Sequence, residues 1–128
     1  MDIVRTIDGL PTRIRGTLQQ EGFESAEFRA ALRTALKPNA TIPILWLVLM
    51  KNALLLCSTH RTRGVYCVFA PEDINELRIV KGTVRSFSIE VIRPGVGDPS
   101  TIIPMPVETS ATVLHEFVSL ANETLRLS

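Results

Sequence analysis

Short apolar segments alternate with polar turns through the middle of the chain, and this pattern is typical of consecutive β-strands. Residues 42–50 and 53–59 are rich in residues that pack as strands, and the Lys51-Asn52 pair between them is short enough for a tight hairpin. A second hairpin follows if residues 64–70 pair with 53–59. The same pattern predicts further strands at 76–81, at 86–92 and, as a short edge strand, at 101–107.

Helical periodicity marks both ends of the chain. Residues 1–22 carry apolar positions at helical spacing, but two glycines and a proline interrupt them, which predicts a short or broken helix. A clearer apolar stripe predicts a helix over 25–37 that ends before Pro38. Its members are Phe28, Ala31, Leu32, Ala35 and Leu36. From Thr109 onward, the pattern predicts an amphipathic helix at the carboxy terminus.

This order of elements predicts an α+β fold. Sequential hairpins closed by one helix favour a small antiparallel β-barrel or bent sheet with a carboxy-terminal amphipathic helix. The length of 128 residues suits one structural unit. We therefore expect residues 1–40 to form an amino-terminal helical extension and residues 41–128 to form the domain.

From residue 44 onward, the order and spacing of these segments resemble a pleckstrin-homology-like (PH-like) domain, the class that includes bacterial PH and GRAM modules. The resemblance covers about two thirds of the chain. It is carried by "LWLVLMKNALLLCST", "GVYCVFAPEDINELRIV", "FSIEVI" and "ETSATVLHEFVSLANETL". It implies a seven-stranded barrel capped by the last helix, of which the sequence analysis finds six or so strands. It also implies binding of phosphoinositides, peptides or other proteins.

Composition narrows the classes of partner. With 14 Lys and Arg against 13 Asp and Glu, the net charge of +1 creates no global field that would attract nucleic acid or anionic membrane. The amino terminus lacks the basic start and apolar stretch of a signal peptide, so a cytoplasmic protein is expected. Lys51 and Asn52 split the apolar region 42–57, and we expect no transmembrane segment.

The segment "IPILWLVLM" (42–50) is apolar on both faces, whereas a strand with one face in water alternates apolar and polar residues. Something must cover the second face, because a large wet apolar patch usually marks an interaction site. The cover could be the helix predicted at 25–37 or a second chain, either another protein or a second copy. The candidate partner-binding residues are Trp46, Val48, Met50, Leu32 and Leu36.

A basic cluster is predicted at the tip of the second hairpin, where His60, Arg61 and Arg63 follow one another closely. Lys81 and Arg85 could assist from the ends of neighbouring strands. Clustered guanidinium groups suit phosphate or carboxylate recognition, including anionic lipid headgroups. The alternative is a solvated loop tip. No aromatic platform accompanies the charges, so nucleic acid is not expected.

The same stretch has a C-x-x-H spacing, Cys57 to His60, and Cys67 could face Cys57 across the hairpin. A structural zinc site normally needs four ligands, and a second pair is missing, so we expect two core-compatible cysteines and no metal. Neither a glycine-rich phosphate loop nor a G-x-S-x-G motif is present. We expect no catalytic residues, no cofactor and no enzymatic activity.

Taken together, these patterns favour a non-catalytic protein interaction or assembly module, an adaptor or scaffold of PH-like type. One alternative is binding of anionic lipid headgroups through the basic hairpin tip. A second alternative is a chaperone-like α+β protein that clamps extended peptides, although the run of consecutive strands fits this class less well.

Overall fold

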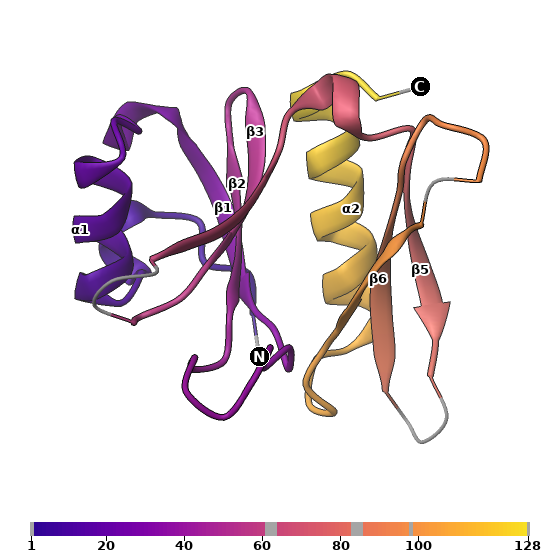
Figure 1. The fold of residues 1–128 in the computed structure, drawn as a ribbon, viewed down its shortest axis with the longest axis horizontal. Helices are drawn as coiled ribbons and strands as arrows, with labels where there is room; N and C mark the ends of the chain where they lie inside the picture. Colours follow the sequence, from indigo (N-terminus) through magenta and orange to yellow (C-terminus); the bar gives the residue numbers. More distant parts are fainter. Residues whose placement is uncertain (1, 61–63, 83–85, 98, 128) are drawn as a thin grey trace.

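The computed structural model describes residues 2–60, 64–82, 86–97 and 99–127 (Figure 1). Within these ranges the chain is α+β, with two antiparallel sheets and a carboxy-terminal helix, as expected. Sheet A has the order β1 (Phe28–Arg33), β2 (Trp46–Met50), β3 (Ala53–Cys57) and β4 (Val65–Phe69). Sheet B has the order β5 (Glu76–Lys81), β6 (Phe87–Ile92) and β7 (Thr101–Pro104).

The helices are α1 (Thr12–Gln20) and α2 (Ala111–Leu125), with single 3₁₀ turns at Ile7–Gly9, Ser25–Glu27 and Pro71–Asp73. The Ser110 hydroxyl caps α2 by accepting a hydrogen bond from the Val113 N–H at 3.2 Å. Neither helix of the described chain is long and apolar enough to cross a membrane.

Both predicted hairpins are confirmed. β2 and β3 pair across the Lys51-Asn52 turn, and β3 pairs with β4 in the next hairpin. Their ladder is regular from Leu54–Phe69 to Leu56–Cys67, after which a bulge shifts the register. Within each sheet, every strand pairs with its neighbours in sequence, so both sheets are meanders.

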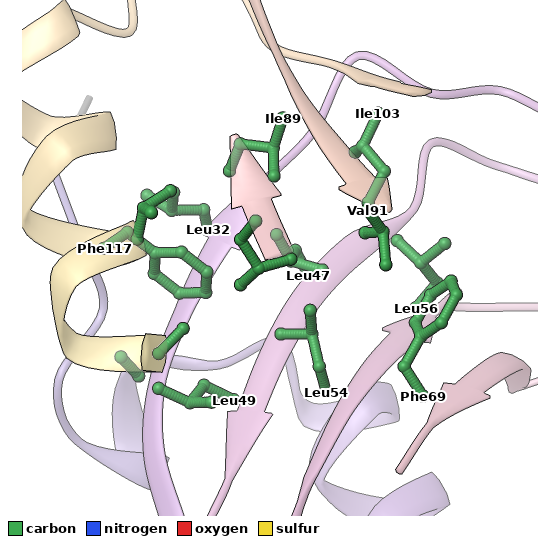
Figure 2. Close-up of a cluster of buried hydrophobic side chains, with 14 of the residues drawn as sticks. Leu32, Leu47, Leu49, Leu54, Leu56, Phe69, Ile89, Val91, Ile103 and Phe117 are labelled. Atoms are coloured by element: carbon green, nitrogen blue, oxygen red, sulfur yellow. The ribbon is translucent and has the colours of Figure 1, made fainter. Parts of the chain in front are cut away.

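The main core lies between the two sheets and α2. Figure 2 shows Leu47 and Leu54 of sheet A meeting Ile89 and Val91 of sheet B, with Phe117 of α2 beside them. All five side chains are fully buried. Burial of such apolar surface contributes about 25 cal/mol per Å² and is the main force that holds these layers together.

A second core lies on the opposite, outer face of sheet A, beneath α1. Figure 1 shows α1 on one side of this sheet and α2 on the other. Ile14 and Leu18, four residues apart on one face of α1, are buried with Val48 and Leu55 of the sheet. Sheet A is therefore covered on both faces by its own chain.

The helix expected over 25–37 is wrong, because residues 28–33 form β1. Ala30 and Leu32 face the main core, while Phe28 and Ala31 face the second core. A strand buried on both faces need not alternate, and here its apolar residues fall at a spacing that imitates a helix. Since β1 pairs with β2, the boundary expected at residue 40 falls inside a sheet.

The two sheets meet at one corner, where the Ala35 N–H donates a hydrogen bond to the Pro104 carbonyl at 2.8 Å. Beside it, Arg33 forms an ion pair with Glu108 at 3.3 Å. At the other corner, β4 and β5 are not paired with each other. The described chain therefore forms two joined sheets and no closed barrel.

The segment before α1 is tied to the free side of β1. The Val4 N–H donates to the Ala31 carbonyl at 2.9 Å, and the Ala31 N–H donates to the Val4 carbonyl at 2.8 Å. Arg5 next to it forms an ion pair with Glu116 of α2. This edge of sheet A is thus occupied.

Candidate functional site

The apolar face expected to bind a partner lies inside the molecule. Val48 and Met50 are at most 1% exposed beneath α1, and Trp46 is half-buried at the margin of the same core. Leu32 and Leu36 point instead into the main core. The cover of the β2 face is therefore the chain itself, through the helix at 12–20 and not through residues 25–37.

Two of the five residues proposed for anion binding are described. His60 is half-buried, and its backbone N–H donates to the Ser58 hydroxyl at 3.0 Å. Lys81 is exposed at the end of β5. Arg61, Arg63 and Arg85 lie outside the described residues.

Beside His60, a pocket of about 280 Å³ opens between α1 and the connection from β3 to β4. It is lined by Arg13, Gly16, Thr17, Gln20, Thr59 and His60. The Arg13 guanidinium reaches the Thr59 carbonyl at 3.5 Å. Sequence reasoning missed Arg13, because nothing local shows that α1 lies next to the hairpin tip.

The two cysteines do not face each other. Cys67 pairs in register with Leu56 and packs against the main core, while Cys57 is buried in the second core on the opposite face of sheet A. Burial raises the pKa of the Cys57 thiol to about 12, and burial also raises the pKa of Cys67. Within the described ranges, no three His, Cys, Asp or Glu side chains gather where they could hold a metal ion.

The outer face of sheet B is uncovered, and its polar side chains largely bond to one another. Arg78 of β5 forms an ion pair with Glu90 of β6 at 2.7 Å, and the Ser100 hydroxyl donates to the same carboxylate at 2.7 Å. The hydrogen bond from Arg78 holds the pKa of Glu90 below its usual range. Such a face is typical of a solvated sheet surface.

The β4 edge is defined as the outer edge of Val65–Phe69 with the side chains of Tyr66 and Val68. Unlike the outer face of sheet B, it is unpaired and apolar. β4 is the last strand of sheet A, and its described residues donate no backbone hydrogen bond to any segment beyond the β3–β4 hairpin. Tyr66 is 47% exposed and Val68 is 48% exposed on the outer face of sheet A, at its margin beyond the cover of α1. The sequence of the strand, VYCVF, contains no charged residue and no proline.

Comparison with known proteins adds no relative. No protein-family model, no curated protein and no solved structure matches the chain. The β4 edge combines unpaired backbone groups with exposed apolar side chains, and we take it as the candidate functional site.

Proposed function

We propose that the chain is a non-catalytic protein interaction or assembly module of PH-like type, acting in the cytoplasm, and that it binds its partner along the β4 edge. The PH-like assignment is supported by the order of elements, seven strands in two antiparallel sheets followed by α2. It is also supported by the hydrogen bond between Ala35 and Pro104, which places the first strand beside the last.

The single observation that carries the function is that the outer edge of β4 is unpaired and carries neither a charge nor a proline. An edge strand presents a row of N–H and C=O groups to which another strand can pair, and proteins usually blunt such edges with charges, prolines, bulges, short strands or a covering segment. β4 has the bulge at its start but no charge and no proline. The regular part, Cys67–Phe69, is open to strand addition.

The opposite edge of the same sheet shows how this chain protects a strand when no partner is involved. There, the segment around Val4 pairs with Ala31, and β7 reaches Ala35. One edge of sheet A is covered in cis and the other is left bare with Tyr66 and Val68 exposed beside it. This contrast favours an intermolecular role for β4.

The test is site-specific photocrosslinking. A benzophenone side chain at position 66, introduced by Tyr66→p-benzoylphenylalanine, should give a discrete adduct in cell extract whose second component is identified by mass spectrometry. The same substitution at Ser119, exposed on α2, is the matched control. Because the contact is apolar, the adduct should persist at high salt. If position 66 gives no adduct beyond that of position 119, the proposed function is wrong.

One observation favours a second function, the binding of anionic headgroups. Arg13 lies in the same pocket as His60, which adds a cation from α1 to the basic hairpin tip. Arg15, on the same helix, pairs with Asp8 at 3.5 Å and does not line this pocket.

Sedimentation with phosphoinositide vesicles tests this second function. Binding that falls with salt and is lost in Arg13→Ala, but kept in Arg15→Ala, would support a headgroup site. Equal binding by the two variants, or no binding at low salt, would exclude the pocket as a headgroup site.

A further inference from the structure

We infer that the partner of the β4 edge is an extended acidic segment of another protein, whose carboxylates pair with Arg93 at one end of β4 and with Arg13 at the other. This inference rests on the proposed function for the location of the contact. It goes beyond that function by naming the chemistry of the partner, a segment with an uncharged centre and with Asp or Glu on either side of it.

Arg93 directly follows β6 of sheet B, and its side chain contacts β4 of sheet A. The guanidinium carbon lies 5.5 Å from the centre of the Phe69 ring, a cation–π contact with the last residue of β4. Burial raises the pKa of the Cys67 thiol, and the positive charge of Arg93 opposes that rise, so the guanidinium is also close to Cys67. A strand that pairs with Cys67–Phe69 therefore passes beside this cation.

Arg93 forms no ion pair with any residue of the described chain. Other arginines are paired within the chain, since Arg5 and Arg78 each bind a glutamate side chain. Asp73, on the 3₁₀ turn after β4, is already engaged, because its carboxylate accepts a hydrogen bond from the Ala70 N–H at 3.1 Å. The cation beside β4 is thus left for a carboxylate from outside the described chain.

Partner binding at the β4 edge makes this requirement strict. A strand laid beside Phe69 removes water from the Arg93 guanidinium, and removing water from a charge is costly unless an opposite charge replaces it. A neutral or basic segment would leave the guanidinium without a counter-charge. Asp or Glu in the segment would instead form a charge-assisted hydrogen bond with it. The chemistry at Arg93 therefore favours an acidic segment among all those that can pair with β4.

A second cation without a carboxylate partner lies near the start of β4. Arg13 of α1 lines the pocket beside His60, and its one hydrogen bond in the described chain is a weak contact of 3.5 Å with the Thr59 carbonyl. Thr17 lines the same pocket and lies against Gly64, the residue before the strand, so the pocket adjoins β4. No acidic side chain of the described residues lines it. Cations therefore flank both ends of a strand that carries no charge of its own.

The length of β4 gives the pattern expected in the partner. The strand has five residues, Val65–Phe69, and a strand rises about 3.3 Å per residue. A segment of about seven residues therefore reaches from one cation to the other. Its acidic residues should lie at its ends, and β-branched or aromatic residues in its centre should pack beside Tyr66 and Val68. Either direction of the added strand meets a cation at both ends.

Selection from a display library of random nine-residue segments, with the purified full chain as bait, is the first experiment. We expect enrichment of Asp and Glu at the outer positions and of uncharged residues between them. A synthetic peptide with the most enriched sequence should crosslink to a benzophenone at position 66, which locates it at the β4 edge. A library that yields no acidic binder would overturn the acidic segment.

Fluorescence anisotropy with that labelled peptide measures the role of Arg93. Arg93→Gln should weaken binding by about tenfold, whereas Arg93→Lys keeps the charge and should retain most of the affinity. Arg29→Gln is the matched control, because Arg29 is also half-buried but lies on β1 at the opposite edge of sheet A and donates to the Ala26 and Phe28 carbonyls. Equal effects of Arg93→Gln and Arg29→Gln would overturn the pairing with Arg93.

A charge reversal gives a readout that loss of packing would not produce. The Arg93→Glu variant, used as bait, should shift the selected segments from acidic residues toward Lys and Arg. Arg13→Gln should weaken the peptide in the same way as Arg93→Gln, and high salt should weaken it further without abolishing binding, since the centre of the contact is apolar. A selected sequence that stays acidic with Arg93→Glu would contradict the inference.

The outcomes separate the inference from the proposed function. An adduct at position 66 with a cellular partner whose crosslinked segment is neutral or basic would overturn the acidic segment and leave the interaction module standing. Absence of both the cellular adduct and any selected peptide at position 66 would remove both. Circular dichroism melting curves should show that each variant is folded.

Discussion

At the scale of single residues, Gly64 is closely packed against a neighbouring side chain, whereas Gly16 faces open space. A Cβ atom added to Gly64 would clash with the Thr17 side chain, so the residue before β4 can approach α1 only without a side chain. A Cβ atom added to Gly16 would have no neighbour within 4 Å. The same residue type is thus required for packing at one position and costs conformational entropy in a helix at the other.

We therefore expect Gly64→Ala to lower the free energy of unfolding by about 1–3 kcal/mol, the usual cost of overpacking. Gly16→Ala should raise it by about 0.5–1 kcal/mol because alanine favours the helix. Urea titration of the two variants measures both changes. If they shift stability in the same direction, the close contact between Gly64 and Thr17 is absent in solution.

The buried thiol of Cys57 gives a prediction for alkaline pH. Its pKa is about 12 in the fold against an ordinary value of 9.0, so between these values the unfolded chain loses the proton that the folded chain keeps. Stability should be unaffected by this group below pH 9.0 and should fall as pH rises toward 12. The slope contributed by one such group is at most about 1.4 kcal/mol per pH unit.

Unfolding titrations of the wild type and of Cys57→Ala across this pH range measure that slope. Subtracting the two curves removes the contribution of lysine and tyrosine side chains that titrate in both proteins. Parallel curves would mean that the Cys57 thiol is accessible to solvent in the folded chain.

At the scale of elements, the sequence predicted best where a single face is buried and turn residues are clear. β6 was predicted from its alternation and is confirmed within one residue at each end, and α2, predicted from its stripe, begins two residues after its predicted start. β1 could not be predicted from its periodicity, because two cores bury its opposite faces. Local periodicity cannot show how many layers a strand lies between.

The cover of sheet A by α1 is an element-scale prediction for stability. Leu18 is buried against the sheet, while its neighbour Gln19 is exposed. Leu18→Ala should lower the free energy of unfolding by about 2–5 kcal/mol, and Gln19→Ala should change it by less than about 0.5 kcal/mol. Thermal and urea unfolding check both values, and equal effects would show that α1 is not docked.

At the scale of the whole molecule, the candidate site depends on contacts that no local pattern contains. A strand at 64–70 was predictable, but whether its far side is open depends on how β5 is placed. Likewise, the apolar face of Trp46, Val48 and Met50 is correctly identified as needing a cover, and only the fold shows that α1 provides it. Candidate surfaces are therefore predictable as apolar segments, and their exposure is not.

The hydrogen bonds between the amino-terminal segment and β1 give a prediction for stability. Val4→Pro removes the N–H that bonds to the Ala31 carbonyl and should lower the free energy of unfolding by about 1–3 kcal/mol. Asp2→Pro is the control, since the Asp2 N–H makes no backbone hydrogen bond in the described chain. Amide hydrogen exchange should show faster exchange at Ala31 in Val4→Pro alone. Unchanged exchange there would contradict the bridge.

That bridge has a further consequence for aggregation. A sheet that is open on both sides can add copies without end and grow into a fibre. In this chain Val4 bridges Ala31 on the β1 side and the Ala35 N–H donates to the Pro104 carbonyl of β7, so the β4 side is the more open edge of sheet A. Loosening the residues around Val4 would therefore expose a second edge of sheet A and favour polymerisation.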